Sequence, residues 1–249
     1  MSEKKSTVSE HLIELRSRLV KSIVFLVIAF VVCYIFSDKI YNFLLEPYAQ
    51  AVKEDGQNRR LIFTALHETF LTYVKLAFFA AFFFSCPIIL IQIWKFIAPG
   101  LYKNEKLALL PFLVATPILF ILGGMLVYYL IMPLAVDFFI SFEKASINGS
   151  LPIQLEPKVN EYLSLVMRLI LAFGLSFQLP VLLTLLAKVG FIDAEYLKTR
   201  RKYVVIIIFS IAAVLTPPDP ITQIGLALPL LLLYEISIYT VKLVEKKNA

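Results

Sequence analysis

The chain has 249 residues, of which 59% are hydrophobic and 17% are charged, and its mean hydropathy is +0.81. A soluble domain of this length has too little interior to bury so much apolar surface, whereas a lipid bilayer can accept it. The net charge of +6 comes from basic residues that flank apolar segments, which argues against a nucleic-acid partner. Cys33 and Cys86 both lie inside apolar runs, so we expect no disulfide, metal site or cofactor.

The amino-terminal segment predicts a helix that begins near Thr7, because residues 7–10 fit a capping box. Apolar residues at helical spacing follow on one face of this helix, and Glu10 and Glu14, four residues apart, share another. From spacing alone, the segment is an interfacial helix with solvated charges.

Six apolar segments predict an all-α membrane protein, a bundle of six transmembrane helices that forms a single domain over residues 1–249. The expected spans are approximately 20–36, 68–93, 107–132, 159–187, 203–215 and 223–239. Four of them approach or exceed the ~20 residues that cross a ~30 Å hydrocarbon core. The fifth is only about 20 Å long and the sixth about 26 Å. This last pair is therefore either a re-entrant hairpin or a pair of spans in a locally thinned bilayer, with its reversal at the proline-rich residues 216–220.

The basic residues outside these segments are distributed unequally between the two sides of the predicted bundle. Sixteen lysines and arginines flank one side and six flank the other, which predicts that both termini are cytoplasmic. On the outer side, residues 38–52 predict an amphipathic helix that is broken at Pro47, and residues 142–158 form a second sizeable loop. We expect these loops to form a cap of interfacial helices over the outer face.

Motifs of the common enzyme classes are absent from the sequence, and its two histidines are far apart, so we expect no catalytic site. Polar residues inside the spans include Arg168, Gln178 and Glu235. Because an unpaired charge at the bilayer centre costs ~2.5–3.5 kcal/mol, we expect Arg168 and Glu235 to be buried with partners. Structural pairing and a functional polar groove both fit these residues. A proton-coupled secondary transporter of a small solute is therefore an alternative function, although the chain has no detectable repeat.

An ordered set of motifs resembles the TatC family of the twin-arginine protein translocase. The matching stretches are HLIELRSRL at residues 11–19, Pro47, CPIIL at 86–90 with Pro87, FIAPGLYKNE at 96–105 with Pro99, FGLSFQLP at 173–180, RRKY at 200–203, and LTPPD at 215–219, which ends with Asp219. Each motif alone is weak, but together they extend from about Leu12 to Tyr239, in order and with the matching number of spans.

The resemblance implies the receptor of a Sec-independent machine that exports folded proteins across the cytoplasmic (inner) membrane, driven by the proton-motive force. It implies that Glu14 and Glu105 bind the arginine pair of twin-arginine signal peptides. Glu10, Arg16 and Phe96 are expected in the same binding region. It also implies an oligomeric complex with single-span Tat partners of the TatA/TatB type. The loops around Pro47, Pro87, Pro99 and Asp219 are expected to have structural or partner-docking roles.

The chemistry of the predicted cytoplasmic face agrees with this implied receptor role. Beside its sixteen basic residues this face has only seven acids, which are Glu3, Glu10, Glu14, Glu105, Asp193, Glu195 and Glu245. Carboxylates accept paired hydrogen bonds from a guanidinium group, which lysine cannot reproduce. Exposed ion pairs contribute only ~0–1 kcal/mol each, so we expect the acids to select the signal and apolar burial to supply most of the affinity.

Gln178 departs from the family pattern, because many relatives have a glutamate at the matching position. The resemblance therefore does not carry over a role that needs an ionised carboxylate inside the membrane. A hydrogen-bonding role remains, since the amide both donates and accepts.

Overall fold

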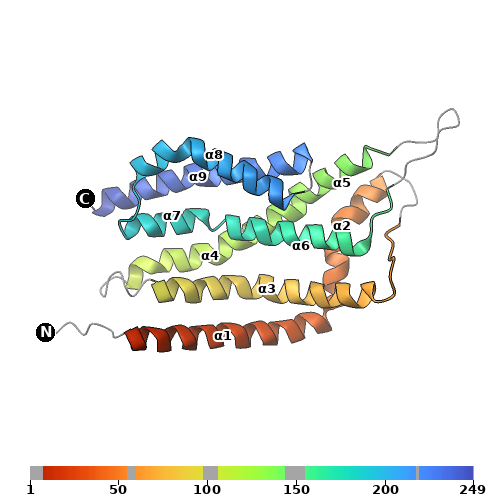
Figure 1. Cartoon of the computed structure of the whole chain (residues 1–249), viewed down its shortest axis with the longest axis horizontal. Coiled ribbons are helices and arrows are strands. Elements are labelled where there is room, and N and C mark those ends of the chain that lie inside the picture. The colour runs from red at the N-terminus through yellow and green to blue at the C-terminus, as the bar shows by residue number, and fades with distance from the viewer. Residues whose placement is uncertain (1–7, 55–59, 98–105, 144–154, 217–218, 249) are drawn as a thin grey trace.

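The computed structural model describes residues 8–54, 60–97, 106–143, 155–216 and 219–248, and these form an elongated bundle of helices (Figure 1). Its elements are α1 (Val8–Ile35), α2 (Ser37–Glu54), α3 (Glu68–Ile97), α4 (Lys106–Leu126), the π-helical turn η2 (Val127–Ile131), α5 (Met132–Ile140), α6 (Val159–Ser176), α7 (Leu179–Lys188), α8 (Ala194–Leu215) and α9 (Pro220–Asn248). Within the described residues the only β-pairing is an isolated bridge between Ile62 and Lys158, so the all-α prediction is confirmed there.

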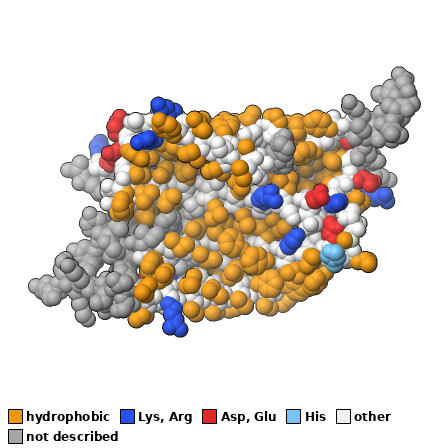
Figure 2. Space-filling view, viewed as in Figure 1, with side chains coloured by type: hydrophobic (Ala, Val, Ile, Leu, Met, Phe, Trp, Pro, Cys, Tyr) orange, Lys and Arg blue, Asp and Glu red, His pale blue; other side chains and the backbone are white. Residues whose placement is uncertain are grey.

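Five stretches of the described chain are long and apolar enough to cross a membrane. They are Leu12–Ile35, Glu68–Ile93, Pro111–Ile140, Val159–Lys188 and Pro220–Lys246. Hydrophobic side chains cover the flank of the bundle, while most charged side chains in the same view lie towards its two ends (Figure 2). Length, composition and surface together identify a multi-pass membrane protein.

The fifth predicted span, residues 203–215, is the apolar part of α8, and this helix is not among the five stretches, whereas the sixth predicted span lies on α9, which is. At 22 residues α8 is about 33 Å long, but its first three turns carry Glu195, Lys198, Arg200, Arg201 and Lys202. The apolar part that follows begins at Tyr203, as the sequence predicts. It is short because the charged residues all lie in the part of the helix before Tyr203 and leave only residues 203–215 apolar.

The two ends of the bundle differ, and Figure 1 separates them clearly. At one end, here called the terminal end, α1 begins, α3 ends, α4 begins and α9 ends (Figure 1). At the other, here called the α2 end, α2 crosses the bundle. There Ile62 N–H donates to Pro157 O (3.2 Å) and Val159 N–H donates to Ile62 O (3.1 Å), so the two loops at this end are joined.

The first predicted span is part of one longer helix. α1 begins at Val8, within a residue of the predicted start, and continues to Ile35 without a break. It packs mainly on α3, and few of its residues are buried. The remaining surface of α1 is a continuous apolar flank that suits contact with lipid.

The predicted break at Pro47 is wrong, because α2 continues through this residue to Glu54. Proline has no N–H, so it leaves the carbonyl four residues earlier, Phe43 O, without its helical donor. The Tyr128 hydroxyl from η2 donates to Phe43 O at 2.8 Å, and the Tyr162 hydroxyl donates to the next carbonyl, Leu44 O, at 3.2 Å. The bundle therefore supplies the donor that the proline removes.

The third predicted span ends at Met132, but the helical run continues to Ile140 through a π-helical turn. In this turn Met132 N–H donates to Val127 O, one residue farther back than in an α-helix. Pro133 follows directly and cannot donate to Tyr129 O, which is consistent with a local change of helical register at this point.

The fourth predicted span is also interrupted, at Phe177 and Gln178 between α6 and α7. Pro180 cannot donate to Ser176 O and its ring clashes with that carbonyl, which explains the end of α6. Upstream of the break, α6 packs closely on α4 at Gly123. A Cβ on Gly123 would lie 2.7 Å from Phe173 O, so only glycine allows this approach.

Candidate functional site

The predicted signal-binding carboxylate of Glu14 lies on α1 near the terminal end, where α1 packs on α3. Arg18, one turn later, donates to Glu14 Oε1 from both Nε (3.0 Å) and Nη2 (2.6 Å). The third nitrogen of the same guanidinium, Nη1, donates to Gln92 Oε1 on α3 at 3.0 Å. Arg18 thus joins the acid on α1 to the carboxyl-terminal part of α3.

The Glu14 carboxylate is anchored through one oxygen and available through the other. Both hydrogen bonds from Arg18 end on Oε1, and within the described residues Oε2 accepts none. The Glu14 side chain is 37% exposed, whereas Arg18 is 23% exposed. A carboxylate in this arrangement is fixed in direction and can accept a further charged hydrogen bond from a guanidinium group.

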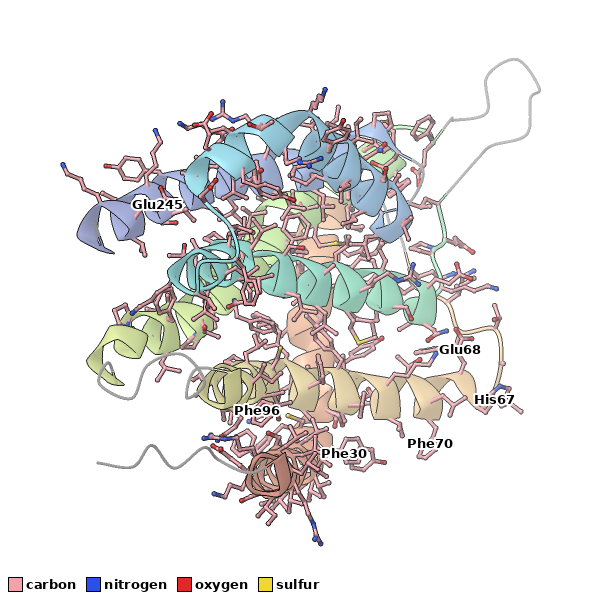
Figure 3. All side chains as sticks on the ribbon, turned by 60° about the vertical axis from the view of Figure 1, so that its left-hand side comes forward. Phe30, His67, Glu68, Phe70, Phe96 and Glu245 are labelled. Carbon is pink, nitrogen blue, oxygen red and sulfur yellow. The ribbon has the colours of Figure 1, made fainter. Side chains whose placement is uncertain are left out.

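The other predicted members of this region are only partly described. Phe96 is half-buried at the terminal end of α3, beside α1 (Figure 3), and Arg16 is exposed on α1. Glu10 belongs to α1, but its side chain lies outside the described residues. Glu105 and Pro99 also lie outside them, although Glu105 directly precedes Lys106, where α4 begins at the same end.

Arg18 and Gln92 complete the Glu14 cluster, although the sequence patterns assigned neither of them a role. For Arg18 a signal existed, since an acid and an arginine four residues apart on a helix face each other. For Gln92 the sequence has no comparable signal, because its contact with Arg18 spans 74 residues and depends on how α3 packs on α1.

Gln178 lies at the break between α6 and α7 and is 6% exposed. Its amide nitrogen donates to Thr116 O on α4 at 3.0 Å and to Gly174 O at 3.5 Å. The side-chain oxygen Oε1 is buried and, within the described residues, has no hydrogen-bond partner. The predicted hydrogen-bonding role is therefore confirmed for the donor half of the amide.

The expected burial of Arg168 and Glu235 is wrong. Arg168 is exposed on α6, and Glu235 is exposed on α9. The expected partner of Glu235 does exist, since Arg201 on α8 donates to its carboxylate at 2.6 Å. Arg168 has no ion pair within the described part of the chain.

These intramembrane polar residues do not form a common site. Gln178 bonds to α4 and Glu235 to α8, and no hydrogen bond or ion pair joins any two of Arg168, Gln178 and Glu235 in the described residues. The arrangement predicted for a small-solute transporter is therefore not observed.

Two of the predicted structural or docking residues have clear local roles. Pro47 is buried in α2 and is accommodated by Tyr128, as described above. Asp219 is 4% exposed and caps α9, accepting hydrogen bonds from the backbone N–H (2.7 Å) and the hydroxyl of Thr222. Pro87 lies half-buried inside α3 without a break in the helix.

Comparison with known proteins gives one consistent family. The family described as Sec-independent protein translocase protein (TatC) matches residues 10–229. Proteins named Sec-independent protein translocase protein TatC from Magnetococcus marinus and Rickettsia prowazekii are similar over nearly the whole chain. The first is 46% identical over 99% of this chain and 88% of its own length, and the second is 45% identical over 95% and 92%.

A solved structure agrees with the sequence matches. The crystal structure of a twin arginine translocase receptor, TatC, superimposes with a TM-score of 0.79 at 36% identity, covering 95% of this chain and all of that one. A second crystal structure of such a receptor, in DDM, gives a TM-score of 0.79 at 37% identity, covering 92% and 98%.

Proposed function

The chain belongs to the TatC family of Sec-independent protein translocase proteins, and we propose that it is the receptor that binds twin-arginine signal peptides through Glu14. The observation that carries this proposal is the half-exposed Glu14 carboxylate, fixed through Oε1 and available through Oε2 in the described residues. Glu105 supplies a second carboxylate, because it precedes the start of α4 at the same end of the bundle.

Arginine is favoured over lysine because of the geometry of the acceptor. A guanidinium group presents parallel N–H donors that match a carboxylate, whereas an ammonium group is a point charge. Arg18 already donates from two nitrogens to Oε1, so the chain itself contains a contact between a guanidinium group and this carboxylate. Phe96, one turn beyond Gln92 on α3, adds an aromatic ring at the same end of the bundle.

Apolar contacts supply most of the affinity in this account. An exposed or half-exposed ion pair contributes about 1 kcal/mol or less, which is too little for tight binding. The apolar flank of α1 begins beside Glu14. The signal's apolar stretch therefore lies along this flank or in the adjacent lipid. The acids thus select the arginine pair, and the apolar surface supplies most of the binding free energy.

We further propose six spans with both termini in the cytoplasm of a bacterium, so that the terminal end is cytoplasmic and the α2 end faces outward. Sixteen basic residues against six support this orientation. The α8–α9 hairpin supplies the last two spans, with the short apolar part of α8 crossing a locally thinned bilayer. All 249 residues form one domain of the inner membrane, in which α2 and the loops joined at Ile62 cap the outer face.

Translocation depends on other subunits in this proposal. A bundle whose centre is filled by packed side chains such as Phe120, Leu163 and Phe173 has no channel for a folded protein. Single-span Tat partners of the TatA/TatB type therefore assemble with this receptor in an oligomeric complex. The proton-motive force drives export, as the family membership implies.

Binding of a labelled twin-arginine signal peptide to the detergent-purified full chain tests the receptor role. The peptide is compared with a twin-lysine version on the wild type, Glu14→Gln and Glu105→Gln. Glu195→Gln is the matched control, because Glu195 is an exposed acid at the same end that pairs with Lys198. We expect each of the first two variants to weaken arginine binding by up to about fivefold, as for a lost half-exposed ion pair. Equal binding of both peptides to the wild type would contradict the proposal.

A further inference from the structure

A groove of about 420 Å³ opens on the surface of the bundle between α7 and α8, with α9 beneath it. Its walls and floor are mostly apolar and include Leu179, Leu183, Val204, Ile207, Ile211 and Leu230. Ile207 and Ile211 are exposed, whereas Leu230 is buried at the floor. Such a groove on a membrane-facing flank must be filled by something apolar, because an empty apolar cavity loses packing contacts.

Arg200 is the only charged residue among the described residues that line this groove. Its guanidinium carbon lies 5.3 Å from the ring centroid of Tyr196 and 5.7 Å from that of Tyr203. Both tyrosines also line the groove. Two rings thus fix the position of the cation, while the N–H donors at the edge of the guanidinium plane stay available.

Two neighbouring basic residues on α8 differ from Arg200 in having acidic partners, whereas Lys202, which does not line the groove, has none within the described residues. Arg201 pairs with Glu235 at 2.6 Å, and Lys198 lies 3.5 Å from Glu195. Arg200 has no acidic partner within the described part of the chain, and its recorded contacts are with the two tyrosine rings. The groove therefore combines an apolar channel with one uncompensated cation at its charged end.

We propose that this groove binds an anionic phospholipid, with the headgroup phosphate on Arg200 and one acyl chain along the channel towards Ile211. The charge of Arg200 decides between a lipid and an apolar helix of a partner protein. An apolar helix offers no anion to this guanidinium group, whereas a phospholipid carries a phosphate next to an apolar chain. An acyl chain is thin enough to enter, and its phosphate complements the free cation.

The position along α8 matches the headgroup level of a bilayer. Charged residues of α8 give way to an apolar run at Tyr203, and tyrosines are typical of this interface. In the orientation proposed above, this is the cytoplasmic leaflet, where basic pockets between helices attract anionic lipids. Only the assignment of the leaflet depends on that orientation; the binding itself is independent of any signal peptide.

The test is native mass spectrometry of the detergent-purified full chain in an equal mixture of phosphatidylglycerol and phosphatidylcholine with the same acyl chains. We expect the wild type to retain phosphatidylglycerol preferentially. Arg200→Gln should reduce this retention roughly tenfold, as for a lost charged hydrogen bond, whereas Arg201→Gln should change it by less than about twofold.

A second pair of variants tests the channel. Ile207→Trp fills the groove and should reduce retention of the lipid, whereas Ile206→Trp, on the adjacent exposed position outside the groove, should not. Inorganic phosphate should fail to compete, because it lacks the apolar chain. Equal losses in Arg200→Gln and Arg201→Gln, full retention in Ile207→Trp, or complete displacement by inorganic phosphate would each overturn the proposal.

Discussion

Arg18 has two effects on the carboxylate that we assign to signal recognition. It holds Glu14 in position against α3, and it occupies the oxygen that an incoming arginine would also use. A pair four residues apart on a helix contributes only about 0.3–0.5 kcal/mol, so a signal peptide can compete with it. Arg18 is therefore an internal competitor whose removal leaves the acid fully available.

Arg18→Gln should tighten binding of a twin-arginine peptide by about twofold, the factor that corresponds to the lost internal ion pair. Lys21→Gln, an exposed basic residue nearby on α1, removes the same charge without a contact to Glu14 and should have a smaller effect. Peptide titration by fluorescence anisotropy measures both. A loss of binding in Arg18→Gln would show instead that the positioning of Glu14 is indispensable.

Tyr128 compensates for a proline on another helix, and this compensation can be measured. Its hydroxyl donates to Phe43 O, which Pro47 leaves without a helical donor, and its ring stacks on that of Phe43 at 4.4 Å. Tyr128→Phe should lower the free energy of unfolding by about 1 kcal/mol, because a partly buried carbonyl loses its partner. Thermal unfolding in detergent provides the measurement, with the exposed neighbour substitution Tyr129→Phe as control.

A double-mutant cycle isolates the role of the proline. In a Pro47→Ala background the helix again has an N–H for Phe43 O, so Tyr128→Phe should then cost much less. An equal cost in both backgrounds would mean that the hydroxyl acts independently of the proline.

At the scale of helices, α4 approaches the backbone of α6 closely at Gly123. Gly123→Ala would place a methyl group 2.7 Å from a backbone oxygen of Phe173, which cannot move aside alone. We expect a loss of about 1–3 kcal/mol in the free energy of unfolding. Gly225→Ala is the matched control, because its methyl would meet only the end of the Ile131 side chain, at 3.0 Å. Similar unfolding temperatures for the two variants would contradict this packing.

Sequence patterns predicted those helices whose ends are determined locally. The capping residues near Thr7 and the prolines at 216–220 mark helix ends by the chemistry of adjacent residues, and both predictions agree with the structure. The continuity of α2 through Pro47 was not predictable in this way, because its missing donor comes from Tyr128, 85 residues beyond Phe43.

The candidate site also combines features that adjacent residues determine with features that depend on contacts between distant residues. Glu14 was identified through the family motif, and its pairing with Arg18 follows from helical spacing. The contact with Gln92, and the exposure of Arg168 in place of burial, both depend on how helices pack against each other, which one sequence does not encode locally. The positions of apolar segments are predictable from hydropathy, whereas partners across helices are not.

For the molecule as a whole, labelling of single cysteines in spheroplasts can test the proposed orientation. The same labelling can test whether the α8–α9 hairpin crosses the bilayer. In a Cys33→Ser, Cys86→Ser background, Glu161→Cys at the α2 end should react with an impermeant maleimide, whereas Glu195→Cys at the terminal end should react only after lysis. Ile221→Cys, at the start of α9, should also react from outside if the last hairpin crosses the bilayer. Protection of Ile221→Cys before and after lysis would indicate a re-entrant hairpin.

The location of signal binding is the central claim, and α3 offers two phenylalanines at opposite ends with which to test it. Phe96 lies beside α1 at the terminal end, and Phe70 lies at the other end of the same helix (Figure 3). A photo-reactive phenylalanine analogue in place of either residue, in the full chain within its membrane, reports which end contacts a bound signal peptide. We predict crosslinks to a twin-arginine peptide from position 96, fewer to its twin-lysine version, and none from position 70. Crosslinking from position 70, or equal yields from position 96 with both peptides, would contradict the account.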